Sequence, residues 1–223
     1  MRFAANAAVT AFLAASLLVP AAAAPARTVS GDVVVSPRDP AVRIRLSKDL
    51  HYVGTRRFVL RDRRLGAFDD CQLYAFVKPR QGALRSLTWV QFEAYRPGHP
   101  ELHHTYDSPR HATIGGLDFY VDTWVSAGMA RPEPGSDEEQ FYALLAAHGY
   151  ARVPMMFVRL VHLTDATKRK ELMIIHGEEL PSGLRAGDLQ KGGAAYARWP
   201  AIERELIGRT EDGIAISAVP IRP

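Results

Sequence analysis

Two strand-like segments, Ser86-Leu-Thr-Trp-Val-Gln-Phe-Glu-Ala-Tyr95 and Leu117-Asp-Phe-Tyr-Val-Asp-Thr-Trp-Val125, flank a polar stretch and decide the fold. Both carry large apolar residues on both faces, and Gly115-Gly116 stands directly before the second segment. Two such runs joined by a polar loop are typical of a hairpin. The sequence therefore predicts that these strands pair with each other, in a sheet that is covered on both faces.

The flanking sequence extends this sheet and adds helices. Residues 41–46 alternate strictly between apolar and charged side chains, and residues 154–163 and 171–176 form two further apolar runs. Ser136 and Glu139 make a capping box before a helix over residues 136–148, and Pro200 begins a second helix. We expect one α+β domain with a mostly antiparallel sheet of about six to eight strands and two helices.

The N-terminus is typical of an export signal. Met1-Arg2 is followed by an apolar core of 13 residues, Ala7 to Val19, and then by small residues. We predict that residues 1–24 are a cleaved signal peptide, with cleavage after Ala23 or Ala26, and that residues 25–223 form the domain. This apolar core is too short to span a membrane, and no later apolar run is long enough to do so. The alanine- and arginine-rich composition suggests a bacterial source, and hence a periplasmic or secreted protein.

The charge and the cysteine content argue against two functions, nucleic-acid binding and catalysis by a cysteine nucleophile. Loss of residues 1–24 removes Arg2 as the one charge, so the formal net charge falls from +4 to +3. The charges alternate in sign and form no basic stripe, which argues against a nucleic-acid partner. Cys71 is the one cysteine, so no internal disulfide can form. Because Asp69 and Asp70 precede it, its thiol pKa should be raised, which favours a buried structural role over a nucleophile.

The polar stretch holds half of the eight histidines of the chain, with Glu101 and Asp107 nearby. Imidazole and carboxylate groups are ligands of zinc, copper and nickel. This stretch therefore predicts a metal site, although its spacing matches no established motif and a solvated hairpin loop would have the same composition. The candidate metal ligands are His99, His103, His104 and His111.

A ligand pocket is the second candidate site. Tyr95, Tyr106 and Tyr120 stand next to the polar loop, where an apolar ring with a polar tip suits a pocket wall. Nearby arginines would supply charge for an anionic ligand; these are Arg57, Arg61, Arg63, Arg64 and Arg159. A third hypothesis, acid–base catalysis by Asp118, Asp122 and Glu93, has no pattern that separates it from ordinary salt bridges.

No nucleophile elbow, phosphate loop, dinucleotide fingerprint or zinc-protease motif occurs in the chain. We therefore expect a secreted or periplasmic, non-enzymatic protein that binds a small molecule, a metal ion or an envelope partner. The alternative is a small metal-assisted hydrolase that uses the loop from His99 to His111. The sequence leaves open whether the protein is an enzyme, which cofactor or ligand it takes and its oligomeric state.

Overall fold

The alternating residues 41–46 form an inner strand of the smaller of two sheets. The computed structural model describes residues 26–80 and 83–219. In it, β1 (Thr28–Ser30), β2 (Val33–Pro37), β3 (Ala41–Leu46) and β11 (Ile214–Ala218) form a four-stranded antiparallel sheet in the order β1-β2-β3-β11. Val42, Ile44 and Leu46 are buried while the intervening arginines are exposed, as the alternation predicts.

The larger sheet has seven antiparallel strands in the order β4-β5-β6-β10-β9-β8-β7. Six of its strands have nine or more residues and are longer than any strand of the smaller sheet, while β7 has five. Their bounds are β4 (His51–Asp62), β5 (Gly66–Arg80), β6 (Ala83–Tyr95), β7 (Arg110–Ile114), β8 (Leu117–Ser126), β9 (Met155–Leu163) and β10 (Lys170–Glu179). The predicted hairpin of residues 154–163 and 171–176 is β9 and β10.

The predicted pairing of the two deciding segments is wrong. The first, within β6, pairs with β5 and β10, and the second, within β8, pairs with β7 and β9. Gly115 and Gly116 have φ of 60° and 81°, which suits the tight turn of a β7–β8 hairpin. That short turn pairs one edge of β8 with β7, and β9 pairs with its other edge, so β8 does not lie beside β6.

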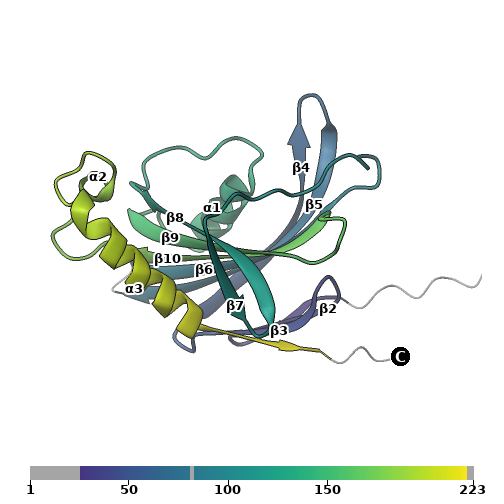
Figure 1. Cartoon of the computed structure of the whole chain (residues 1–223), viewed down its shortest axis with the longest axis horizontal. Coiled ribbons are helices and arrows are strands. Elements are labelled where there is room, and N and C mark those ends of the chain that lie inside the picture. Colours follow the sequence, from purple (N-terminus) through teal and green to yellow (C-terminus); the bar gives the residue numbers. More distant parts are fainter. Residues whose placement is uncertain (1–25, 81–82, 220–223) are drawn as a thin grey trace, which may run out of the picture.

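Apolar side chains cover both faces of the larger sheet, as the two-sided strands predict. One layer lies between the two sheets and includes Ile44, Phe92 and Ile174. The other lies under α1 (Asp137–Ala147) and includes Trp89 and Phe141, whose ring centroids are 4.5 Å apart. Figure 1 shows the resulting arrangement, with α1 on one face of the larger sheet and the smaller sheet on the other.

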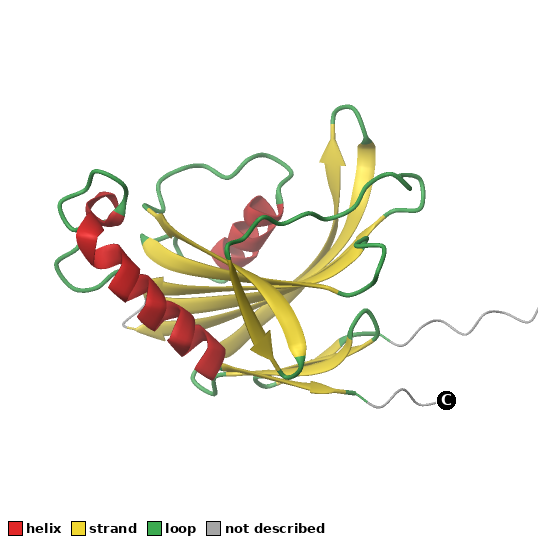
Figure 2. Cartoon of the chain, in the orientation of Figure 1, coloured by secondary structure: helices red, strands yellow, loops and turns green. Residues whose placement is uncertain are grey.

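The two predicted helices are present, with small differences at their ends. Ser136 caps α1 by accepting from the Glu139 amide at 3.1 Å, while the Glu139 carboxylate accepts from Gly135 rather than from Ser136. The second predicted helix is α3 (Trp199–Asp212), which continues past Gly208. Figure 2 shows α3 extending from the larger sheet towards the strand β11 that follows it.

The α+β class is therefore confirmed, with more elements than the sequence predicted. The described residues hold eleven strands in two sheets, one single-turn helix α2 (Ala186–Leu189) and a short 3-10 helix η1 (Tyr196–Arg198) besides α1 and α3. The proposed signal peptide, residues 1–24, lies outside the described residues. None of the described helices combines the length and the apolar character that a membrane crossing requires.

Candidate functional site

A row of polar side chains crosses three central strands on the α1 side of the larger sheet. In the register of the sheet, Glu93 of β6 lies opposite Cys71 of β5 on one side and opposite Glu171 of β10 on the other. Directly opposed residues project from the same face of a sheet. Cys71, Glu93 and Glu171 are each less than a tenth exposed, so this row lies in the interior.

Asp69 and Gln91 extend the row into a cluster, because residues two apart in a strand share a face. The candidate ligand atoms of Asp69, Cys71 and Glu93 all lie within 4.8 Å of one another. Gln91 donates from Nε2 to the Glu93 Oε1 at 2.6 Å. Asp69 Oδ1 and Gln91 Oε1 are buried and have no hydrogen-bond partner among the described residues. We call these five residues, Asp69, Cys71, Gln91, Glu93 and Glu171, the acidic cluster.

Burial shifts the proton equilibria of this cluster. It raises the pKa of Asp69 to about 7, and a hydrogen bond to the Ala94 backbone offsets part of the effect. Burial and the neighbouring Glu171 raise the pKa of Glu93 well above its usual range. The pKa of the Cys71 thiol is also raised, first by burial and then by Glu93 and Asp69. Burial thus favours the protonated form of all three groups, and a nearby positive charge would oppose this.

The polar loop between β6 and β7 covers one end of this cluster. Tyr106 donates from its hydroxyl to the Glu171 Oε2 at 2.7 Å, and His104 Nδ1 lies 3.0 Å from the same oxygen. Burial raises the pKa of Glu171 to about 7, although the Tyr106 hydrogen bond opposes this shift. Burial also lowers the pKa of His104 to about 4, so that its ring is neutral at neutral pH.

Arg169 fixes the course of this loop. Its guanidinium donates to the backbone carbonyls of Tyr95, Arg96, His99 and Leu102 at 2.6–3.3 Å. The His104 amide also donates to the Lys168 carbonyl at 2.7 Å. Carbonyl groups in an irregular segment need such partners when the segment packs against a protein surface. The β9–β10 turn, which carries Lys168 and Arg169, therefore holds the loop in place.

The three tyrosines predicted to line a pocket pack around this loop. Tyr95 stacks on the His104 ring with centroids 4.2 Å apart. Burial raises the pKa of Tyr95 to about 12. Tyr106 lies 5.4 Å from Tyr120, centroid to centroid. These contacts are with other side chains of the protein, and the proposal that the tyrosines bind a ligand stays a prediction.

The four candidate histidine ligands have different surroundings. His104 is buried beside Glu171, whereas His103 is exposed and its Nδ1 lies 3.1 Å from the Glu101 carbonyl. His99 Nδ1 lies 3.7 Å from the Glu101 carboxylate. His111 is exposed and packs on Tyr120. In the described parts of the chain, the group of three or more potential ligands with close ligand atoms is Asp69, Cys71 and Glu93, and a metal site made by these histidines stays a prediction.

The carboxylates considered for acid–base catalysis are not a pair. Asp122 accepts from Ser108 and from Arg159 at 2.7 Å each, while the exposed Asp118 accepts from Thr113. In the strand order, β10 and β9 lie between β6, which carries Glu93, and β8, which carries Asp118 and Asp122. Sequence reasoning considered Glu93 but missed Asp69 and Glu171 as its neighbours. The alternation along each strand shows which residues share a face of the sheet. It does not show which strands are adjacent.

No family model matches the chain, and no curated protein or solved structure is significantly similar to it. The chemistry of the site must therefore be argued from its own residues.

Proposed function

We propose that the exported protein is a non-enzymatic binding protein that holds a divalent metal ion, zinc above all, between Asp69, Cys71 and Glu93. One observation carries the proposal: three potential ligand atoms from two adjacent strands lie within 4.8 Å of one another in the interior. Asp69 is 1% exposed, and its Oδ1 has no hydrogen-bond partner among the described residues. A buried carboxylate oxygen without a partner is costly, and a cation would remove that cost.

The donor set favours zinc over calcium or magnesium. Calcium and magnesium take oxygen ligands, whereas zinc takes thiolate, imidazole and carboxylate together. Bond lengths of about 2.0 Å to oxygen and 2.3 Å to sulfur place tetrahedral ligand atoms roughly 3.3–3.5 Å apart. The three ligand atoms already lie within 4.8 Å of one another, so small side-chain rotations would complete the geometry. Gln91 donates from Nε2 to Glu93, and the buried Oε1 of the same amide has no hydrogen-bond partner among the described residues.

Burial favours binding over catalysis at this site. Cys71 and Glu93 are 4% and 9% exposed, while a catalytic zinc keeps an open position for water and substrate. The alternative function, a metal-assisted hydrolase that uses the loop from His99 to His111, would require those histidines to meet at one place. His103 and His111 instead have separate, exposed surroundings. The periplasm or the exterior remains the proposed location, where a buried Cys71 would be protected from disulfide exchange.

Zinc uptake by the mature protein tests the proposal. Equilibrium dialysis should give one zinc per chain, and cobalt(II) should give the near-ultraviolet sulfur-to-metal absorption of a thiolate ligand. Cys71→Ser should abolish that absorption, and Asp69→Asn and Glu93→Gln should each weaken zinc binding at least about tenfold. Asp70→Asn is the matched control, because Asp70 is the exposed neighbour of Asp69 in the sequence. Its Oδ1 lies 3.7 Å from Arg96 Nε.

Equal zinc binding by Asp69→Asn and Asp70→Asn would overturn the proposal. So would the absence of zinc uptake by the unmodified protein, which would leave the cluster as carboxyl groups that share protons. Circular dichroism of each variant separates a lost ligand from a lost fold. A cobalt spectrum without the sulfur band would exclude Cys71 and overturn the three-ligand set.

A further inference from the structure

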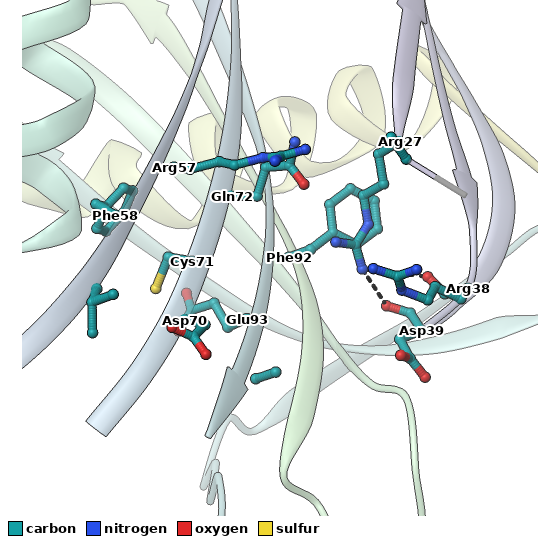
Figure 3. Close-up of a pocket in the computed structure, with 13 residues that line it drawn as sticks. Arg27, Arg38, Asp39, Arg57, Phe58, Asp70, Cys71, Gln72, Phe92 and Glu93 are labelled. Carbon is teal, nitrogen blue, oxygen red and sulfur yellow. Dashed lines mark hydrogen bonds between the residues drawn. The ribbon is translucent and has the colours of Figure 1, made fainter. Parts of the chain in front are cut away.

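A cavity of about 650 Å³ lies beside β5 and β6. Four of the six residues of these strands that line it project away from α1, namely Asp70, Gln72, Phe92 and Ala94, and the other two are Cys71 and Glu93. The cavity opens where the β1 end and the β2–β3 turn of the smaller sheet approach β4, β5 and β6. Its volume is in the range of small-molecule sites, about 300–1,000 Å³. Figure 3 shows Arg27, Arg38 and Asp39 beside Phe92, with Cys71 and Phe58 farther off across the strands.

Arginines from three separate segments line this cavity: Arg27, Arg38 and Arg57. Arg27 lies with its guanidinium carbon 4.0 Å from the centre of the Phe92 ring. It donates from Nε to Ser36 Oγ at 3.0 Å and from Nη2 to the Arg38 and Asp39 carbonyls. These contacts hold the Arg27 side chain in position and leave its Nη1 without a hydrogen bond among the described residues.

Arg57 approaches the cavity from the opposite side, on the edge strand β4. It is exposed and makes no side-chain hydrogen bond or ion pair within residues 26–80 and 83–219. The Tyr74 side chain is 2% exposed, its hydroxyl has no hydrogen-bond partner among the described residues, and its ring lies edge-on to Phe92. Burial raises the pKa of Tyr74 to about 12, while the charges of Arg27 and Arg57 lower it, which places this hydroxyl within the field of both arginines.

Two of the three carboxyl groups that line the cavity, Asp39 and Asp70, have cationic partners, while the third, Glu93, accepts from Gln91. Asp39 Oδ1 lies 3.1 Å from Lys170 Nζ, and Asp70 Oδ1 lies 3.7 Å from Arg96 Nε. Neither carboxylate is hydrogen-bonded to the Arg57 guanidinium. The Arg57 guanidinium therefore has donors available to an anion, and Arg27 Nη1 offers a donor from the other side.

We propose that this cavity binds a small organic anion whose carboxylate or phosphate group lies between Arg27 and Arg57. Guanidinium groups match the planar arrangement of such oxyanions. The apolar part of the ligand would contact Val59 and Ala94, which also line the cavity. Two of the proposed zinc ligands, Cys71 and Glu93, also line this cavity, whereas Asp69 does not. The anion is placed between Arg27 and Arg57, beside Gln72 and Phe92, which project away from the proposed zinc ligands because adjacent residues of a strand project to opposite faces.

Isothermal titration of the mature protein with octyl phosphate, octanoate, inorganic phosphate and neutral octyl glucoside tests this site. The two amphipathic anions should bind, octyl glucoside should not, and inorganic phosphate should bind more weakly than octyl phosphate. Whether octyl phosphate or octanoate binds more tightly distinguishes a phosphate from a carboxylate ligand. Arg57→Gln should weaken binding of the tighter probe at least about fivefold.

Arg45→Gln is the matched control, because Arg45 is an exposed arginine of β3 outside the cavity. It removes the same charge and should leave the affinity unchanged. Equal losses in Arg57→Gln and Arg45→Gln would reduce the effect to net charge and overturn the proposal. Failure of the unmodified protein to bind any anionic probe would overturn it too. The Asp69→Asn variant, which tests the zinc site, should bind the anions normally, so that either proposal can fail without the other.

Discussion

Glu93 and Glu171 lie directly opposite each other in the β6–β10 pair, so two carboxyl groups are neighbours on one buried face of the sheet. Their surroundings differ. Glu93 accepts from Gln91 on its own strand, whereas Glu171 accepts from Tyr106 of the covering loop. The second contact connects the loop to the core and can be tested without altering a proposed metal ligand.

Replacement of Tyr106 by Phe should lower the free energy of unfolding by about 1–2 kcal/mol, because the buried Glu171 carboxyl loses a hydrogen-bond donor. Urea denaturation measures the change. Tyr196→Phe is the control, since Tyr196 is 45% exposed, and its effect should be close to zero. Equal stability of the two variants would show that the Tyr106–Glu171 hydrogen bond contributes nothing.

Arg169→Lys should loosen the loop, because a single ammonium group cannot replace a guanidinium that donates to four carbonyls. We expect faster hydrogen exchange at the amides of Leu102 and His104 and a loss of about 1–2 kcal/mol in unfolding free energy. Arg63→Lys, at the exposed tip of the β4–β5 hairpin, should change neither. Unchanged exchange in Arg169→Lys would contradict this role.

The pH dependence of stability should reveal Glu178. Burial would raise its pKa, but hydrogen bonds from His176 and Arg209 outweigh burial and lower the pKa to about 2 from a usual 4.5. A lowered pKa in the folded state stabilises it above pH 4.5, and this contribution is lost as the pH falls towards 2. Glu178→Gln should therefore cost about 1–2 kcal/mol at pH 7 and almost nothing near pH 2.

The adjacent Glu179 provides the control for that pH series. It is exposed and lies 3.5 Å from Arg85, so Glu179→Gln should cost less than about 0.5 kcal/mol at either pH. Thermal unfolding of both variants between pH 2 and pH 7 measures the difference. A Glu178→Gln deficit that is constant with pH would rule out the ionic contribution.

Gly177 should tolerate no side chain. A Cβ at this position would lie 2.6 Å from the ring of the buried Phe157, so Gly177→Ala should destabilise the protein by about 1–3 kcal/mol through overpacking. Gly208 lies inside α3 with nothing within 4 Å of such a Cβ. Gly208→Ala should instead stabilise the helix by about 0.5–1 kcal/mol. Opposite signs in urea denaturation are the expected result, and a stable Gly177→Ala protein would contradict the packing.

Local patterns in the sequence predicted individual elements well. The alternation of residues 41–46 gave β3, the cap at Ser136 gave the start of α1, and Pro200 lies in the first turn of α3. Each of these signals depends on residues within one or two turns or a single strand. The burial of Cys71 also followed from its neighbours. The short helix α2 had no comparable signal, because no apolar stripe marks its single turn.

Strand pairing and the acidic cluster could not be predicted in the same way. Period-two alternation shows which residues share a face, but it does not show which strand lies alongside. The sequence favoured pairing within residues 86–125, whereas β6 pairs with the distant β10. Glu171 and Asp69 meet Glu93 through that pairing and through the β5–β6 pair. The histidine loop contacts the acidic cluster, because His104 and Tyr106 reach Glu171 from it.

The alternation along β5 and β6 also restricts how this protein can change in evolution. Asp70, Gln72 and Phe92 line the cavity that Arg27 and Arg57 approach and project away from α1, while Asp69, Leu73 and Gln91 project to the α1 side. An insertion or deletion of one residue in either strand would move the following side chains to the opposite face of the sheet. Residues that line the cavity would then project towards α1, and residues that pack under α1 would project into the cavity. Length variation should therefore be confined to the tips of the hairpins, and these two strands should change by substitution alone.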